Sequence, residues 1–445
     1  MAAILRQAGH QVNIFDRYAQ QKMNDPGREA VNNAMLAAIR NFKPDLIGFG
    51  TVSPLIYDTV ACVALVRQSY DGLIVAGGPH ATALPALTLD KIPGLDGVIQ
   101  GEGEEAIVSL ANGDNPAEIP GLWWKSDADS QPTSYCRPCQ IKDLDNLPFP
   151  AFDLLDMDFY TRPSTYPIAG YYLSSVSLLT ARGCLQNCEF CCESLTYGKG
   201  LRFHSPEYVI AWLNQVLTDY KINGVYFHDN DFLVNEQRIR QLCEMMLAGG
   251  IAEKIRWGMQ TRADRISPEI LVLLKRAGCV YLEMGIETAL QSQLDQVGKA
   301  ISVGTAEQAI NWCRRAGITI RAYLMTGFQG ETLETMKTTL DWLKQFKPDI
   351  FTWNLLALYP GTTLYEKMGH NFFALHDWHE AAIVDFYGRD HLSSVPRKER
   401  DQWQKKQLFP YRNYRRQRHV LRVNSLCRLS SLASNILREK VKNVI

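Results

Sequence analysis

Short apolar runs of strand length alternate with amphipathic helical segments along most of the chain. Repeated alternation of this kind is typical of a parallel sheet covered by helices, so the pattern predicts an α/β protein. Two blocks of the pattern are separated by residues 112–173, which are rich in Pro, Asp and aromatic residues and have few periodic runs. We interpret that stretch as a linker between two domains.

The first block predicts an open, doubly wound, Rossmann-like parallel sheet. Its chain begins inside a helical segment that Gly9 ends, with no strand before it, although such a domain normally opens with a strand. We therefore expect the first strand of this domain to be missing. The predicted strands are residues 12–15, 45–50, 72–76 and 97–99, and the predicted helices lie near residues 28–41, 56–69 and 102–111.

The second block predicts a partial (β/α)6 barrel of the TIM type, in which chemistry takes place at the carboxyl ends of the strands. Its strands are expected at residues 174–180, 224–228, 255–260, 280–285, 319–325 and 350–356, with helices near 206–220, 236–249, 267–277, 305–316 and 331–345. The predicted domains are a Rossmann-like domain at 1–115, a linker at 116–173, a barrel at 174–366 and a helical, basic C-terminal extension at 367–445.

Composition limits the class of protein. The chain has 445 residues, of which 46% are hydrophobic and 21% charged, values typical of folded globular proteins with two or three domains. The chain shows neither an uncharged apolar run long enough to span a membrane nor a signal peptide. We therefore predict a cytoplasmic protein without a membrane span.

Charge and cysteine content add two further indications. Lys plus Arg and Asp plus Glu both number 47, yet residues 411–445 hold nine Lys or Arg and one Glu. This segment is either a solvated helical appendage or a surface for an anionic partner such as RNA or the substrate. The eleven cysteines are an odd number without an export signal, which favours metal binding over disulfides for those that cluster.

Three cysteines cluster directly after the first predicted strand of the barrel. Cys184, Cys188 and Cys191 form a CxxxCxxC loop, which is short enough for the three thiolates to surround one metal centre. A cubane cluster has four irons, so three cysteines leave one iron open and reactive. Two alternatives remain: a structural zinc site with Cys192 or His204 as the fourth ligand, or unrelated buried thiols.

This loop, with Phe190 before its last cysteine and at the start of a barrel, resembles the radical S-adenosylmethionine (SAM) superfamily over residues 174–366. The resemblance implies that Cys184, Cys188 and Cys191 hold a [4Fe-4S] cluster, whose open iron binds the amine and carboxylate of SAM. One electron, from a donor such as flavodoxin or ferredoxin, then cleaves SAM to methionine and a 5′-deoxyadenosyl radical that abstracts hydrogen from a substrate. Phe190 is a candidate contact for SAM.

Acidic residues follow the second barrel strand. Asp229 is our first choice, ahead of Asp231, for the carboxylate that receives the ammonium group of SAM, by resemblance to the acidic motif of the family. A helix-capping Asp is the alternative for either residue.

Further stretches resemble motifs that surround SAM in the family. Arg262 after the third strand and Glu287 after the fourth are candidates by this resemblance, with a plain salt bridge as the alternative for each. Gly327 and Gly330 after the fifth strand permit close approach of the backbone to a bound nucleoside. Gln329 stands where the family usually has Pro.

In the first domain, glycines and small hydroxyl residues follow successive strands, a pattern suited to a large flat ligand with a phosphate-linked tail. These loops resemble the cobalamin-binding domain that precedes many radical SAM barrels. The candidate cobalamin-binding residues are Thr51, Ser53, Leu55, Gly77, Gly78, Gly101 and Glu102. The Asp-x-His-x-x-Gly motif of classical cobalamin proteins is absent, because neither His10 nor His80 has that spacing.

Cys136 and Cys139 form a lone CxxC in the linker. A redox pair or half of an auxiliary cluster site would explain the spacing, but we favour incidental thiols because no further paired cysteines accompany them.

Together these features predict an oxygen-sensitive radical SAM enzyme that uses cobalamin to methylate an unactivated carbon of a small molecule. An anaerobic oxidative cyclase of tetrapyrrole type would use the same parts. A tRNA methylthiotransferase would need a first domain with three cluster cysteines and a terminal RNA-binding barrel, neither of which is visible, so we do not expect a nucleic-acid partner. A catalytically inactive iron-sulfur or zinc scaffold is disfavoured by the intact Asp229, Glu287, Gly327 and Gly330.

Overall fold

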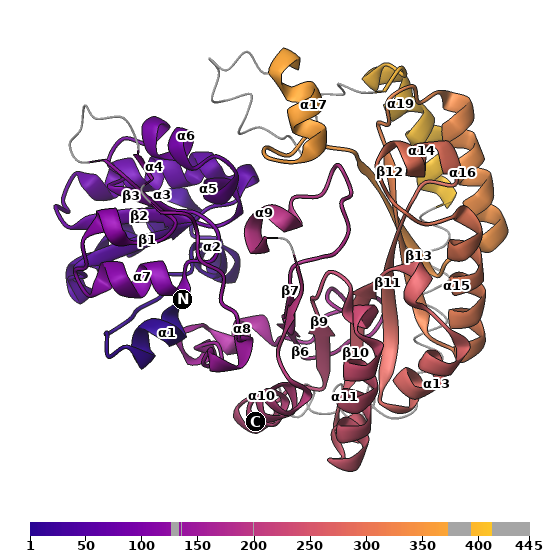
Figure 1. Cartoon of the computed structure of the whole chain (residues 1–445), viewed down its shortest axis with the longest axis horizontal. Coiled ribbons are helices and arrows are strands. Elements are labelled where there is room, and N and C mark those ends of the chain that lie inside the picture. The colour runs from indigo at the N-terminus through magenta and orange to yellow at the C-terminus, as the bar shows by residue number, and fades with distance from the viewer. Residues whose placement is uncertain (126–132, 135, 199, 373–392, 412–445) are drawn as a thin grey trace.

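The chain forms two α/β units, each built around a mostly parallel sheet, with the short helix α9 (Glu193–Tyr197) between them (Figure 1). The predicted fold class is confirmed, since an open Rossmann-like sheet precedes a partial barrel. No helix in the described part of the chain has the length and apolar character needed to cross a bilayer. The computed structural model describes residues 1–125, 133–134, 136–198, 200–372 and 393–411.

The first sheet has the strand order β1-β2-β3-β4-β5. Its first three strands are parallel, as predicted, whereas β4 pairs antiparallel with β3 and β5 antiparallel with β4. The sheet therefore extends into the segment that we interpreted as a linker, beyond the expected boundary at residue 115. The strands are β1 (Leu46–Gly50), β2 (Leu73–Gly77), β3 (Gly97–Ile99), β4 (Leu122–Trp124) and β5 (Thr133–Ser134).

Helices cover both faces of this sheet because its side chains alternate between two cores. Ile74 and Ala76 of β2 pack with α3, α4 and α6, whereas Val75 packs with α1 and α7. The predicted helices near 28–41, 56–69 and 102–111 are confirmed as α3, α4 and α7. The helices of this unit are α1 (Ala2–Gln7), α2 (Arg17–Asn24), α3 (Gly27–Phe42), α4 (Ile56–Arg67), α5 (Pro79–Ala83), α6 (Pro85–Lys91) and α7 (Glu104–Ala111), with 3₁₀ turns η1 (Ser53–Leu55) and η2 (Pro116–Glu118).

The predicted strand at residues 12–15 is wrong, because this segment is irregular backbone that leads into α2. A strand needs a hydrogen-bonded neighbour, and the only partner of β1 among the described strands is β2. The apolar spacing has another cause: Phe15 packs against the core that α3 and α4 share. Asp16 then begins α2, because its carboxylate accepts a hydrogen bond from the backbone N–H of Ala19.

The second sheet is fully parallel and contains the six predicted strands, with β6 and β13 at its open edges. Its order, β13-β12-β11-β10-β9-β6, follows the order of these strands in the sequence, as expected for consecutive βα units of a partial barrel. The strands are β6 (Ser175–Leu178), β9 (Gly224–Phe227), β10 (Arg256–Thr261), β11 (Cys279–Glu287), β12 (Thr319–Thr326) and β13 (Ile350–Leu355).

One apolar core joins this sheet to the helices on its outer side. The helices begin where the sequence supplies caps: Ser205, Ser267, Ser302 and Thr332 each accept a hydrogen bond from the N–H three residues later. All five predicted helices are confirmed. The helices are α10 (Pro206–Asp219), α11 (Glu236–Ala248), α12 (Ile251–Lys254), α13 (Pro268–Arg276), α14 (Gln291–Gln296), α15 (Val303–Ala316) and α16 (Leu333–Phe346), with η5 (Phe232–Val234) and η6 (Ala263–Arg265).

Shorter elements connect and extend the two units. The described parts of the predicted C-terminal extension are helical apart from residues 393–396, whereas its basic residues from Arg412 onward and Cys427 lie outside the described residues. The remaining elements are η3 (Leu144–Asn146), η4 (Phe152–Leu154), α8 (Met157–Tyr160), the two-stranded hairpin of β7 (Ala181–Arg182) and β8 (Arg202–Phe203), α17 (Thr363–Phe372), α19 (Arg397–Trp403) and the π-helical turn η7 (Gln404–Leu408).

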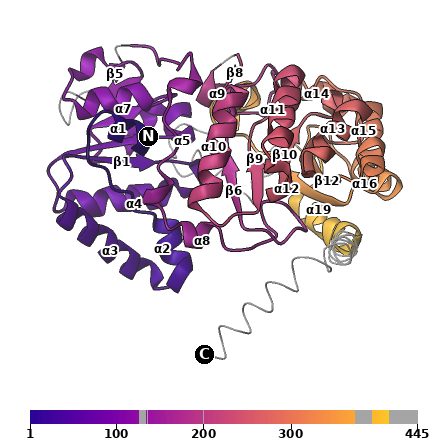
Figure 2. The ribbon, with the colours of Figure 1, turned by 90° about the horizontal axis from the view of Figure 1, so that it is seen from below.

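The two units lie side by side, with α8, α9 and α10 near their junction (Figure 2). Helix α5 of the first unit contacts α9 of the second. The connecting segment also contacts the first unit, where Tyr160 hydrogen-bonds Asp16 and Arg6 forms a 2.7 Å ion pair with Asp153.

Two buried histidines predict a loss of stability in mild acid. Burial lowers the pKa of His80 to about 4. Burial also lowers the pKa of His204 to about 4, although the nearby Asp145 raises it. In the unfolded chain each titrates near pH 6.5, so the unfolded state gains protons first and stability falls as the pH drops from about 6.5 to about 4. Between pH 7 and pH 5 each histidine should cost about 2 kcal/mol.

Urea unfolding of His80→Gln and His204→Gln variants at pH 7 and pH 5 tests this. Each variant should lose less stability on acidification than the unmodified chain. The exposed His228 serves as the control, and His228→Gln should keep the original pH dependence. An unchanged pH dependence in both buried variants would contradict the expectation.

Candidate functional site

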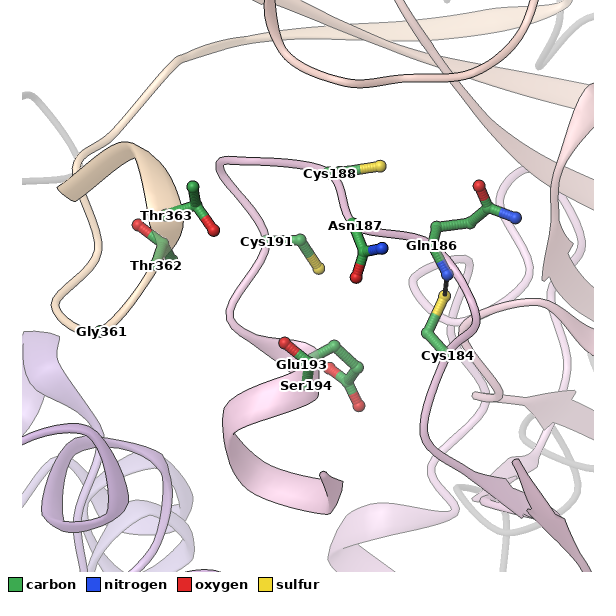
Figure 3. A pocket seen from close by; sticks show the side chains of 10 residues that line it. All are labelled: Cys184, Gln186, Asn187, Cys188, Cys191, Glu193, Ser194, Gly361, Thr362 and Thr363. Atoms are coloured by element: carbon green, nitrogen blue, oxygen red, sulfur yellow. Dashed lines mark hydrogen bonds between the residues drawn. The ribbon is translucent and has the colours of Figure 1, made fainter. Parts of the chain in front are cut away.

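The three predicted cysteines lie on one loop that leaves the hairpin strand β7 and enters α9. Cys184, Cys188 and Cys191 line a single cavity of about 230 Å³. Figure 3 shows them on this loop with Asn187 among them, while Gly361–Thr363 approach from the segment that follows β13. The cavity is lined by the loop that follows the first barrel strand and by the segment that follows the last, at the carboxyl side of the sheet where barrel active sites lie.

The donor set fits an iron-sulfur cluster better than a zinc ion. In the described chain no three His, Cys, Asp or Glu side chains converge closely enough to hold one ion. A four-iron cluster is larger than a single ion and keeps its thiolates further apart, so three thiols around one cavity suit it. The fourth ligands considered for zinc, Cys192 and His204, do not line the cavity, and His204 instead contacts Asp145 and stacks on Tyr208.

Cys184 and Cys188 are half-buried and Cys191 is exposed at the cavity. Burial raises the pKa of Cys188 and raises that of Cys191 to about 12. A thiol with such a pKa stays protonated at neutral pH and becomes a thiolate ligand only when a cation compensates its charge. The site is therefore suited to a positively charged metal centre rather than to a free nucleophile.

Asp229 lies beneath the cysteine loop and is fully buried. Its carboxylate accepts hydrogen bonds from Thr180 N (2.5 Å), Thr180 Oγ1 (2.6 Å) and Ala181 N (3.1 Å). Arg238 donates to the carbonyls of Thr180 and His204, which ties the same turn to α11. Asp229 thus supports the loop, and its contact with the ammonium group of SAM stays a prediction.

Asp231 also points into the protein at the same strand end. It accepts hydrogen bonds from Thr261 Oγ1 (2.8 Å) and from Arg265 Nε (3.4 Å). It therefore joins β9 to the start of the loop after β10, and a role in SAM binding stays a prediction for this residue as well.

Arg262 and Glu287, by contrast, lie close to the cysteine loop. Burial is the largest influence on the pKa of Cys188 and raises it. The charges of Lys299 and Arg262 lower this pKa, and the charge of Glu287 raises it. Glu287 forms a buried 2.7 Å ion pair with Lys299, and Arg262 binds Asp264 through two 2.9 Å hydrogen bonds. The structure thus brings both predicted residues to Cys188, together with Lys299, which the sequence analysis missed.

Glu287 is also strained. Its φ of 65° is a left-handed conformation that non-glycine residues rarely adopt, and the ladder between β11 and β12 is irregular at this point. Gly285 makes room for the ion pair, because a Cβ there would lie 2.3 Å from Glu287 Oε1 and 2.8 Å from Lys299 Nζ. Strain at a strand end beside the cysteine loop is typical of a functional site.

The other barrel candidates frame this region. Phe190 packs with Val297, Phe328 and Leu356, so an apolar cluster connects the cysteine loop to the strand ends. Gly327 has a φ of 97°, and its N–H donates to the buried Glu331 at 2.8 Å, while Gly330 has a φ of 73°. The two glycines thus shape the turn after β12, and their close approach to a bound nucleoside stays a prediction.

Five cobalamin candidates of the first unit meet at the carboxyl ends of β1 and β2. Thr51 N and Oγ1 both donate to the carbonyl of Gly77. A Cβ on Gly78, whose φ is 103°, would lie 2.7 Å from Thr51 O, so this approach requires glycine. Ser53 Oγ lies 3.0 Å from Nδ1 of the buried His80, and the nearby Leu55 is 61% exposed.

The remaining two candidates follow β3. Gly101 N donates to Thr82 Oγ1 at 3.0 Å, which places it beside the same strand ends. Glu102 instead directs its carboxylate to the barrel, where it pairs with Arg182 and Arg202.

Helix α5, which follows the carboxyl end of β2, approaches the cysteine cavity. Gly361 lines the cysteine cavity, and a Cβ added to it would lie 3.6 Å from the Cβ of Ala83 and 2.8 Å from Leu195. Ala83 ends α5, the helix that follows the Gly77-Gly78 turn of the first sheet. The predicted cofactor regions of the two units are therefore neighbours.

A polar network inside the barrel was also missed by the sequence analysis. The buried Glu283 of β11 accepts hydrogen bonds from the hydroxyls of Tyr226 (2.6 Å), Tyr281 (2.6 Å) and Tyr323 (2.7 Å) and from Arg321 (3.1 Å). These residues come from three strands and meet only in the folded sheet. Burial and the adjacent carboxylate raise the pKa of Tyr323 to about 12, so the tyrosines remain donors.

Two family models match the chain. The model described as the radical SAM superfamily matches residues 178–343, and the model described as the B12 binding domain matches residues 1–111. The chain thus contains both domains, which confirms the predicted resemblance. The B12 model covers the region of Thr51, Gly77 and Gly101, and the radical SAM model covers the cysteine loop.

Similar proteins support this assignment. An uncharacterized methyltransferase of Pyrococcus horikoshii is 28% identical over 393 residues, which are 86% of this chain and 81% of that protein. The anaerobic magnesium-protoporphyrin IX monomethyl ester cyclase of Cereibacter sphaeroides is 27% identical over 362 residues, which are 79% of this chain but 58% of that protein. The structure of the radical SAM methyltransferase TsrM from Kitasatospora setae, with cobalamin and a [4Fe-4S] cluster bound, shares the fold with a TM-score of 0.68 at 17% identity, over 83% of this chain and 70% of that one.

The cysteine assignment predicts which thiols bind iron. After anaerobic reconstitution, Cys184→Ala, Cys188→Ala and Cys191→Ala should each lose most of the iron and sulfide, because each removes one of three ligands. Cys192→Ala is the matched control and should keep them, since Cys192 does not line the cavity. Full iron content in Cys188→Ala would contradict the assignment.

The barrel network predicts a stability effect. Glu283→Ala should lower the free energy of unfolding by roughly 3 to 5 kcal/mol, because it leaves Arg321 and three tyrosine hydroxyls without their shared acceptor. Glu244→Ala, at an exposed position of α11, should change it by less than about 0.5 kcal/mol. Equal stabilities of the two variants in urea unfolding would show that the network contributes little.

Proposed function

We propose that this radical SAM enzyme, whose chain also carries a B12-binding domain, methylates an unactivated carbon of a small polar substrate. The observation that carries the proposal is that α5, which follows the carboxyl end of β2, contacts α9 and approaches the cysteine cavity, where a Cβ on Gly361 would lie 3.6 Å from the Cβ of Ala83. Ligands of open parallel sheets and of barrels bind at the carboxyl ends of the strands. Cofactors at these two edges would face each other, as transfer of a group between them requires.

Similarity supports a methyl transfer. The relative from Pyrococcus horikoshii, of which this chain spans most of the length, is named a methyltransferase, and so is TsrM. Because the TsrM structure contains cobalamin and a [4Fe-4S] cluster on the same fold, this architecture is able to hold both groups.

Each part of the site has a role in this proposal. Cys184, Cys188 and Cys191 hold the cluster. When bound, the cluster supplies the electron that cleaves SAM, and cobalamin supplies the carrier for the methyl group. Glu287, with its partner Lys299, offers fixed charges beside Cys188 for the polar groups of SAM.

Other residues shape the surroundings of that site. The Gly327 turn allows a nucleoside to approach the backbone. The apolar cluster around Phe190 and Phe328 excludes water from the strand ends, which protects a reactive radical.

The inner face of the barrel sheet supports a substrate with polar groups. Residues two apart on a strand share a face, so His228 lies on the same face as Tyr226 of the Glu283 network, and Gln260 is in register with Glu283. His228 is exposed, and Gln260 and Tyr323 are half-buried. Such a face offers hydrogen bonds, which favours a substrate with polar groups over a hydrocarbon.

Anaerobic oxidative ring formation is the second candidate. The relative from Cereibacter sphaeroides, named as a cyclase, is 27% identical, although this chain spans only 58% of its length. The tRNA methylthiotransferase alternative is weaker, because residues 1–115 contain a single cysteine, Cys62.

Isotope transfer separates the two candidates. The reconstituted enzyme with a strong reductant should convert SAM to 5′-deoxyadenosine, and hydroxocobalamin should bind with a stoichiometric change in its visible spectrum. With SAM labelled as S–CD₃, a methylated product of an extract of small metabolites should carry the CD₃ group by mass spectrometry.

Three results would count against the proposal. Release of 5′-deoxyadenosine by protein that does not bind cobalamin would contradict the proposed methyl carrier. A product that loses hydrogen but carries no label would favour ring formation. Absence of 5′-deoxyadenosine from protein with full iron content would contradict the radical chemistry itself.

A further inference from the structure

The loop that follows β3 joins the two units through buried charges. The side chain of Glu102 is 2% exposed, and the side chains of the two arginines that it meets, Arg182 and Arg202, are 15% and 14% exposed. Buried charges need partners of opposite sign, so this pairing is a built feature of the interface rather than a surface contact.

The carboxylate of Glu102 is fully occupied by protein donors. Both of its oxygens pair with Arg202, one of them with Nη1 at 2.9 Å. Arg182 Nη1 donates to it at 3.1 Å, and so does the backbone N–H of Ile141. Although Glu102 was a candidate for cobalamin binding, both of its oxygens are engaged by donors of the protein.

Glu104 completes the contact from the first turn of α7. Its carboxylate accepts a 2.6 Å hydrogen bond from Arg182 Nη2. Burial by itself raises the pKa of Glu104, but the hydrogen bond and charge of Arg182 outweigh burial and lower that pKa. Both acidic residues of the Gly-Glu-Gly-Glu turn therefore bind the barrel.

The two arginines close the stem of the cysteine loop. Arg182 and Arg202 face each other across the β7–β8 hairpin, and the three cavity cysteines lie between them in the sequence. The strands approach so closely that a Cβ at Gly183 would lie 2.0 Å from Gly200 O. Two cations side by side on a two-residue ladder repel each other, and Glu102 neutralises that repulsion from the other unit.

We infer that Glu102 and Glu104 form an interdomain clamp that couples binding of cobalamin in the first unit to the cluster loop of the second. The inference rests on the proposed function, because it assumes that cobalamin binds beside Gly101, the residue that precedes Glu102. A ligand that orders the loop after β3 also fixes the carboxylates that hold the cysteine stem. Cobalamin then strengthens the binding of the cluster, and by linkage the cluster strengthens the binding of cobalamin by the same factor.

The test compares Glu102→Gln with a matched control in the full chain. Glu102→Gln keeps the shape of the side chain but removes its charge, while Glu105→Gln changes an exposed neighbour on α7. Two quantities are measured: the rate of iron loss to a chelator with and without hydroxocobalamin, and the dissociation constant of hydroxocobalamin with and without the cluster. Neither depends on turnover.

In the unmodified chain, cobalamin should slow iron loss and the cluster should tighten cobalamin binding, each by at least about fivefold. Glu105→Gln should behave the same. In Glu102→Gln the ratio of iron-loss rates and the ratio of dissociation constants should both fall to about one, although the variant still binds cobalamin and still takes up iron. Arg202→Gln should act like Glu102→Gln, and the double variant should show no further loss.

If Glu102→Gln shows the same coupling as the unmodified chain, the clamp is wrong. The clamp is also wrong if the unmodified chain binds both cobalamin and the cluster but shows no coupling between them. If Glu102→Gln does not fold, Glu104→Gln, which keeps the Glu102 pairs, should show partial loss of coupling, and full coupling there counts against the clamp. If the unmodified chain binds no cobalamin, the proposed function fails. The rate of iron loss then tests whether Glu102 holds the cysteine stem, which requires faster loss in Glu102→Gln than in Glu105→Gln.

Discussion

The site depends on how a short loop with three thiols is held in place. Its first turn is fixed by one buried carboxylate, since Asp229 accepts hydrogen bonds from Thr180 and Ala181, just before the loop begins. Burial raises the pKa of Asp229, while Thr180 and the charge of Arg238 oppose this rise. A carboxylate in such surroundings is stable only with its donors in place, so the backbone turn and the carboxylate stabilise each other.

Other features of the site follow from that fixed loop. Phe190 reaches the apolar cluster at the ends of β12 and β13, and Cys188 comes to lie beside the charges of Glu287, Lys299 and Arg262. From the opposite side, Glu102 and Glu104 secure the hairpin that closes the loop. The loop is thus held by the barrel below it and by the first unit beside it, so the position of the cysteines depends on both units.

The elements of the fold were largely readable from the sequence, because the period of apolar residues reports burial in strands and helices. All six barrel strands and the five longest helices between them were predicted, whereas the short helices α9, α12 and α14 were not, and serine or threonine caps mark several helix starts. The errors concern pairing. Residues 12–15 have the composition of a strand, yet they are irregular, and β4 and β5 extend the first sheet through a segment that shows little periodicity. Whether a segment is a strand depends on the neighbour it finds, which periodicity does not report.

By itself, the sequence determined the fold class, the cysteine loop and the resemblance to two domain families, because local spacing reports each of these. Only the tertiary structure decided which side chains share a site. Lys299 joins Glu287, three tyrosines and Arg321 converge on Glu283, and Glu102 turns away from the first unit to neutralise two arginines. These contacts join residues from 2 to 100 positions apart. Charges are paired according to burial and distance in the folded chain, and no local pattern contains that information.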